Sequence, residues 1–186
     1  MYKGVEIVAE VKTHSPSGWV SPYSWDELFE IANQVGDILS IHTESPWGGS
    51  FDLLKKARSR TDKPILAKGI HARDKDIDKA LNECDADYAL AVGRVPELYA
   101  ERCFIEPYTL QELGGLAVSQ RTVWNSRDLR TRGLKSIPFS AAREVFKGPL
   151  YQASNVKRLA DIDLTARGVI IGTCLPDLAG DLLSSQ

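Results

Sequence analysis

Short apolar segments rich in β-branched residues recur along the chain, and each ends in a polar or charged residue. They are apolar on both faces, which is typical of strands in a buried parallel sheet. Eight such segments are present, and eight parallel strands close a (β/α)₈ barrel. In chain order they read VEIVAEVK, DILSIHTE, KPILAKG, ADYALAVG, RCFIEP, RTVWNSRD, GPLYQAS and RGVIIGT.

Amphipathic helices are expected between these strands, over residues 24–35, 52–59, 72–82 and 140–146. The first has capping-box spacing, with Ser24 followed by Glu27. The starts of the fourth, fifth and sixth strands are separated by only about 15 and 18 positions, whereas a strand, a helix and two loops need roughly 25. We therefore predict a minimal (β/α)₈ TIM barrel of the α/β class, with helices 4 and 5 shortened or missing. Their remnants are expected near residues 96–101 and 110–113.

Composition narrows the class of protein without specifying its chemistry. The 186 residues are 43% hydrophobic and 26% charged, with a net charge of −2, which suits one soluble domain over residues 1–186. This balance predicts neither a nucleic-acid partner nor attraction to an anionic membrane. Charges interrupt every apolar run, so we expect no signal peptide, no membrane span and a cytoplasmic protein. The length is short of the ~250 residues usual for this barrel.

The cysteines indicate neither a disulfide framework nor a zinc site. Cys84, Cys103 and Cys174 are odd in number, widely spaced and never in a CxxC pair. They are interpreted as small buried hydrophobic residues. No metal and no cofactor are expected.

Polar residues follow the strands at the positions where active sites of parallel barrels form, the carboxyl ends. Lys68 follows PILA and Glu106 follows CFI, and burial would lower the pKa of the lysine and raise that of the glutamate. A structural Lys–Glu ion pair is the competing interpretation, but polar residues recur at nearly every strand end, which favours a site. These residues are Glu10, Lys12, Lys68, Glu106, Asn125, Arg127, Gln152, Ser154, Gly172 and Thr173.

Glycines after two strands suggest anion binding. Gly172 and Thr173 end the eighth strand, where phosphate sites of this fold form from backbone N–H groups. Gly48 and Gly49 follow the second strand and could cradle an anion, although such glycines more often allow a tight loop.

Six motifs, in order along nearly the whole chain, resemble the indole-3-glycerol phosphate synthase family. They are EVKTHSPSG at 10–18, SIHTESPWGGS at 40–50, PILAKG at 64–69, FIEP at 104–107, WNSRDL at 124–129 and IIGTCL at 170–175. The resemblance implies a small phosphorylated substrate, 1-(2-carboxyphenylamino)-1-deoxyribulose 5-phosphate. That compound would be cyclised to an indole with loss of carbon dioxide and water, without metal or cofactor.

The same resemblance implies a role for each matching residue. Lys68 corresponds to the general acid of ring closure and Glu106 to a carboxylate of the acid–base steps. Lys12, with Glu10 beside it, corresponds to the lysine that assists dehydration. Asn125 is implied as a catalytic residue that, with Arg127, holds the anthranilate part. The remaining residues implied in substrate binding are Ser15, Ser154, Gly172 and Thr173.

The sequence departs from the family pattern in several places. The first predicted strand begins almost at Met1, where the family carries a helical extension, and His14 replaces a lysine. QASN replaces ESG after the seventh strand, so that Gln152 is expected to remove a negative charge and Asn155 stands at a glycine position. These departures leave two alternatives open: a weak or inactive relative that binds a phosphosugar or a pathway partner, and an enzyme for another phosphorylated substrate. The shortened helices would bare part of the barrel wall, which a homo-oligomer could cover.

Overall fold

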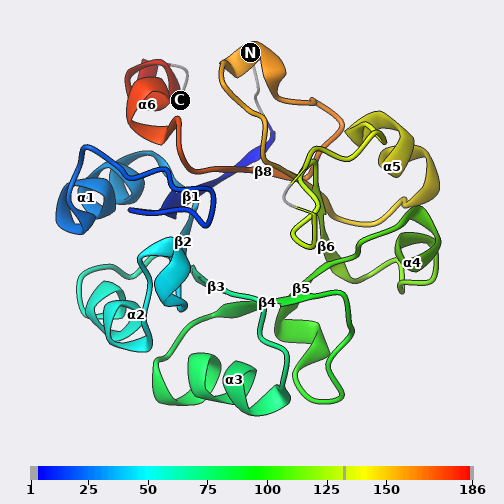
Figure 1. The fold of residues 1–186 in the computed structure, drawn as a ribbon, viewed down its shortest axis with the longest axis horizontal. Coiled ribbons are helices and arrows are strands. Elements are labelled where there is room, and N and C mark those ends of the chain that lie inside the picture. Colours follow the sequence, from blue (N-terminus) through cyan, green and yellow to red (C-terminus); the bar gives the residue numbers. More distant parts are fainter. Residues whose placement is uncertain (1–3, 132, 185–186) are drawn as a thin grey trace.

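Eight parallel strands form a closed barrel in the order β1 to β8, so that β1 also pairs with β8 (Figure 1). The computed structural model describes residues 4–131 and 133–184. The strands are β1 (Glu6–Val11), β2 (Ile38–His42), β3 (Ile65–Lys68), β4 (Tyr88–Val92), β5 (Cys103–Glu106), β6 (Arg121–Asn125), β7 (Leu150–Ala153) and β8 (Gly168–Ile171). Each falls within one of the eight predicted apolar segments, and the predicted (β/α)₈ barrel is confirmed.

Helices surround the barrel on its outer side (Figure 1). They are α1 (Trp25–Val35), α2 (Phe51–Arg58), α3 (Asp74–Asp78), α4 (Leu110–Gly114), α5 (Phe139–Val145) and α6 (Leu175–Ser184). The shorter helical turns are η1 (Ser45–Trp47), η2 (Lys79–Glu83, a π-helix that continues α3), η3 (Ala100–Arg102) and η4 (Leu159–Asp161). The predicted capping box is present, because Ser24 Oγ accepts from Glu27 N at 3.3 Å and Glu27 Oε2 accepts from Ser24 N at 2.8 Å.

The shortening of the fourth and fifth helices is also confirmed, but it is not confined to them. Only the three-residue η3 joins β4 to β5, and the five-residue α4 joins β5 to β6. The β7–β8 connection carries only η4, also of three residues. Three of the connections between strands are therefore shortened, and the shortening of the β7–β8 connection was not predicted.

The barrel encloses one apolar cluster, and a second cluster packs between the strands and the helices. Inside the barrel the Phe104 ring lies 4.7 Å from that of Tyr151 and 5.4 Å from that of Tyr88. Outside it, Phe29 of α1 and Leu54 of α2 are fully buried. Polar side chains occupy both ends of the barrel, beyond these packed layers.

The cysteines form no disulfide, and Cys84 and Cys103 are buried. Over residues 4–131 and 133–184, no helix has the length and apolar character needed to cross a membrane.

The outer cluster predicts a large loss of stability when Leu54 is truncated. Leu54→Ala should lower the free energy of unfolding, measured by urea titration, by about 2–5 kcal/mol because it leaves a cavity. Leu164, which is 65% exposed, provides the matched control, and Leu164→Ala should change stability by no more than about 0.5 kcal/mol. Equal effects of the two substitutions would contradict the packing described.

Candidate active site

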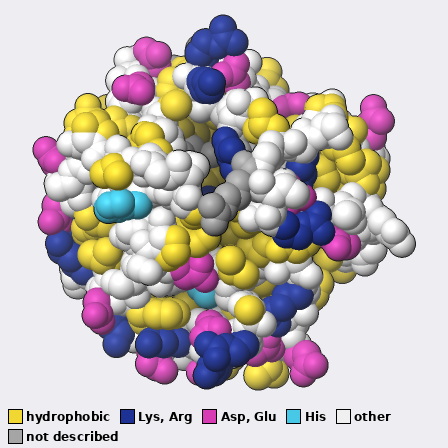
Figure 2. Space-filling view, viewed as in Figure 1, with side chains coloured by type: hydrophobic (Ala, Val, Ile, Leu, Met, Phe, Trp, Pro, Cys, Tyr) yellow, Lys and Arg dark blue, Asp and Glu magenta, His cyan; other side chains and the backbone are white. Residues whose placement is uncertain are grey.

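The carboxyl ends of the strands bring most of the predicted site residues to one mouth. Following the strand register around the barrel places Glu10, Lys68, Glu106 and Ala153, from alternate strands, in one interior layer. The next layer towards the mouth includes His42 and Asn125. Figure 2 views this face and shows a hollow near its middle with Lys or Arg side chains in it.

Glu10 is the centre of the β1–β3 side of the mouth. Its Oε1 accepts from Lys68 Nζ and from His42 Nε2, the latter at 3.0 Å. Burial acts to raise the pKa of Glu10, but the positive charge of Lys68 and the interactions with His42 outweigh it. The pKa of Glu10 is therefore held well below its usual value, and the side chain is a carboxylate.

His42 was not predicted to belong to the site. Burial lowers its pKa, although Glu10 acts in the opposite direction, so we assign a neutral ring whose Nε2–H donates to the Glu10 carboxylate. Trp47 stacks on this ring at 5.7 Å between centroids. His42 Nδ1 is buried and has no hydrogen-bond partner within the described part of the chain. A polar residue inside the apolar run of the second strand was the signal that could have found it.

Glu106, Asn125 and Ser154 form a hydrogen-bonded chain on the opposite side. Asn125 Nδ2 donates to Glu106 Oε1 at 2.9 Å, and Ser154 Oγ donates to Asn125 Oδ1 at 2.7 Å. The backbone N–H of Arg127 donates to the same Oδ1 at 2.9 Å, which fixes the orientation of the amide. Burial raises the pKa of Glu106, while Lys68 and Asn125 act in the opposite direction. Glu106 can therefore hold a proton at a pH where an exposed glutamate has lost it.

Two further lysines lie near these carboxylates. Burial lowers the pKa of Lys12, and the opposing charge of Glu10 does not restore it. Lys135, which was not predicted, lies with its Nζ 3.2 Å from the carbonyl oxygen of Pro107 and 4.1 Å from the centroid of a Trp124 ring. Its charge acts on Glu106, and its position in the long connection after β6 gave no sequence signal.

The residues that follow β7 and β8 are the predicted anion-binding positions. Ser154 and Asn155 adopt left-handed backbone angles, with φ of 64° and 58°, and asparagine tolerates this conformation better than most residues. Gly172 lies directly against Glu10, because a Cβ at this position would overlap Glu10 Oε2. This glycine is therefore needed to seat the Glu10 carboxylate, whatever else binds beside it.

Three predicted residues are placed less centrally. Ser15 lies in the β1–α1 connection, where its hydroxyl is 2.6 Å from that of Ser17, and Arg127 and Thr173 are exposed at the rim. The glycines after β2 pack tightly, since a Cβ on Gly49 would overlap the backbone of His42. The tight-loop interpretation of these glycines is the one that this geometry favours.

The prediction that Gln152 faces the mouth is wrong. Its Nε2 donates to the carbonyl oxygen of Asp161 at 2.9 Å, and its Oε1 accepts from Asp163 N at 2.9 Å. It therefore faces outward and holds the β7–β8 connection, whereas Ala153 faces the barrel interior. The two residues were confused because neighbouring residues of a strand point to opposite faces. The competing interpretation was a structural Lys–Glu ion pair, and the structure contains one, but between Lys68 and Glu10, whereas Glu106 accepts from Asn125.

A scan of family models and a search of curated proteins both find no match for this chain.

The raised pKa of Glu106 predicts a pH-dependent gain in stability when its charge is removed. An unfolded glutamate loses its proton near its ordinary pKa, whereas folded Glu106 keeps it to higher pH. Between these two pKa values the folded state binds more protons than the unfolded state. The contribution of Glu106 to wild-type stability therefore falls as pH rises. Relative to wild type, Glu106→Gln should therefore become progressively more stable as pH rises from 4 to 8.

Urea midpoints at each pH measure this difference. Glu97→Gln is the matched control, because it removes a carboxylate that is exposed to solvent. A stability difference between Glu106→Gln and wild type that stays constant over the whole pH range would contradict the description of Glu106.

Proposed function

We propose that this protein is an indole-3-glycerol phosphate synthase. The observation that supports the proposal most is the meeting of two acid–base centres at one mouth. Lys68 bonds to Glu10 on one side, and Glu106 bonds to Asn125 on the other. These four residues come from four different strands, and the family-like motifs identified in the sequence contain all of them.

Ring closure needs an acid at the substrate carbonyl. The aromatic carbon that bears the carboxylate attacks the carbonyl carbon of the ribulose part, and the carbonyl oxygen takes a proton to become a hydroxyl. We assign this proton to the Lys68 ammonium, which Glu10 orients at the base of the mouth. The substrate would have to draw Lys68 away from Glu10, and the low pKa of Glu10 keeps it as a carboxylate that does not compete for the proton.

Decarboxylation and dehydration complete the proposed reaction. The closed ring carries a cationic imine, and the electron pair of the breaking carbon–carboxylate bond neutralises it as carbon dioxide leaves. The hydroxyl then leaves as water with a proton from an acid, while a base removes a proton from the adjacent carbon. We assign Lys12 to the acid and Glu106 to the base, because burial shifts the pKa of each towards neutrality.

Substrate binding is assigned to the rim. The phosphate would lie between the ends of β7 and β8, with Ser154 following β7 and with Gly172 and Thr173 between β8 and the start of α6. Arg127, which is exposed beside Asn125, would hold the carboxylate of the anthranilate part. Two alternatives would use the same rim: a protein that binds this substrate without turnover, and an enzyme that acts on another phosphorylated compound. The assay below distinguishes both from the proposed function.

Substitution of Lys68 tests the proposed function. The purified protein is incubated with 1-(2-carboxyphenylamino)-1-deoxyribulose 5-phosphate, and the fluorescence of the indole product is followed. Lys68→Met should lower kcat by at least about 10²-fold, the usual share of a general acid, with affinity for the product retained. Lys55→Met, on the exposed face of α2, should leave kcat unchanged.

The same experiment can overturn the proposal. Wild-type protein that binds the product but forms none at high enzyme concentration would indicate the binding-only alternative. Turnover of other phosphorylated compounds, but not of this one, would indicate a different substrate. Unchanged kcat in Lys68→Met would contradict the assignment of the acid.

A further inference from the structure

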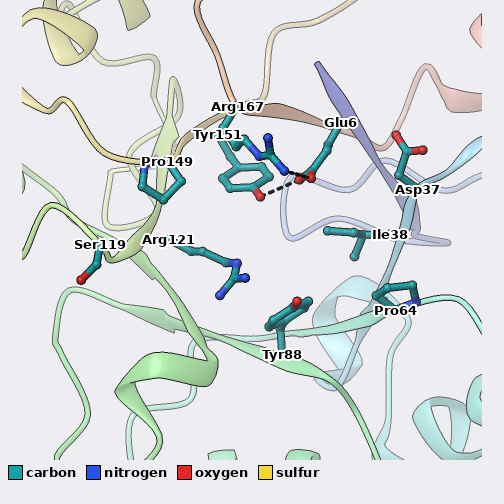
Figure 3. Close-up of a pocket in the computed structure, with 10 residues that line it drawn as sticks. All are labelled: Glu6, Asp37, Ile38, Pro64, Tyr88, Ser119, Arg121, Pro149, Tyr151 and Arg167. Carbon is teal, nitrogen blue, oxygen red and sulfur yellow. Dashed lines mark hydrogen bonds and ion pairs between the residues drawn. The ribbon is translucent and has the colours of Figure 1, made fainter. Parts of the chain in front are cut away.

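A cavity of about 320 Å³ opens at the end of the barrel opposite the candidate active site (Figure 3). It is lined by residues at the starts of strands and in the loops before them, among them Glu6, Ile38, Tyr88, Arg121, Tyr151 and Arg167. The packed interior of the barrel, which includes Leu66, Leu90 and Val123, lies between this cavity and Lys68. What binds here is therefore independent of the proposed function.

The acidic groups of the cavity already have partners. Glu6 accepts from the Tyr151 hydroxyl at 2.7 Å and forms an ion pair with Arg167. Asp37 accepts from the backbone N–H of Ile7 at 2.8 Å. Figure 3 shows the Glu6 interactions as dashed lines at one side of the cavity. Arg167 is thus neutralised by Glu6 and is not available as a separate positive charge for a ligand.

Arg121 is different, because its guanidinium has no such partner. It projects into the cavity (Figure 3) and lies 4.7 Å from the centroid of the Tyr88 ring. Across residues 4–131 and 133–184, no carboxylate lies within 4.0 Å of it and no hydrogen bond from its guanidinium is found. Most other arginines donate to a carboxylate or a backbone carbonyl: Arg58, Arg60, Arg73, Arg94, Arg102, Arg130, Arg143, Arg158 and Arg167.

We propose that this cavity binds a small aromatic carboxylate, held by Arg121. A guanidinium presents two parallel N–H groups that match the two oxygens of a planar carboxylate. The lining carries two guanidinium groups, Arg121 and Arg167, and two carboxylates, Glu6 and Asp37. A monoanion therefore adds one negative charge to a balanced lining, whereas a phosphate dianion would add two close to Glu6 and Asp37. Ile38, Pro64 and Pro149 provide an apolar wall for a flat ring, and the volume is at the lower end of the range of small-molecule sites.

Benzoate is the probe that tests this site. We expect calorimetry to show binding of benzoate, and at least tenfold weaker binding of its uncharged counterpart benzamide and of inorganic phosphate. Arg121→Gln should weaken benzoate binding at least tenfold. Because benzoate could also enter the mouth of the barrel, Arg127→Gln is the matched control, and it should leave the affinity for benzoate unchanged.

A second variant covers the case in which Arg121→Gln does not fold. Ile38→Phe retains Arg121 and fills part of the cavity, so it should also weaken benzoate binding while wild-type circular dichroism is kept. Absence of benzoate binding to the wild-type protein would overturn the proposal, as would equal affinity for benzoate and benzamide. Loss of binding in Arg127→Gln but not in Arg121→Gln would place benzoate in the mouth and would also overturn it.

Discussion

The mouth of the barrel depends on the interactions that stabilise the buried carboxylate of Glu10. A buried carboxylate is stable only when positive charges and hydrogen-bond donors surround it, and Glu10 obtains both from Lys68 and His42. The carboxylate also constrains the residue that follows β8, because only glycine at position 172 leaves room for Glu10 Oε2. One side chain of β1 therefore constrains a residue of β2, a residue of β3 and the glycine that follows β8.

The two ends of the barrel treat charge differently. At the mouth, burial raises the pKa of Glu106, whereas Lys68 and His42 lower the pKa of Glu10 in spite of its burial. Because their pKa values differ, Glu10 is suited to remain ionised and Glu106 is suited to exchange protons. At the opposite end, Glu6 and Arg167 neutralise each other, and the guanidinium of Arg121 is left facing a cavity. The packed interior residues, among them Leu66, Leu90 and Val123, separate the two ends.

Sequence patterns predicted the fold well because eight apolar segments and a capping box are local signals. They placed Lys68, Glu106 and Asn125 at the mouth because each ends a strand. They failed where orientation depends on tertiary contacts: Gln152 faces outward to hold the β7–β8 connection, and the shortness of that connection was overlooked. His42 and Lys135 were missed because their proximity to Glu10 and Glu106 arises only when distant strands and loops meet. The unpartnered state of Arg121 likewise has no sequence signal.

A crystal structure with indole-3-glycerol phosphate bound would test most directly whether the mouth carries out the proposed ring closure. We expect the phosphate between the ends of β7 and β8, near Asn155 and Gly172, with the indole ring directed towards Lys68 and Glu106. Product bound in another orientation, with its phosphate away from β7 and β8, would contradict it. So would an empty mouth at a saturating product concentration.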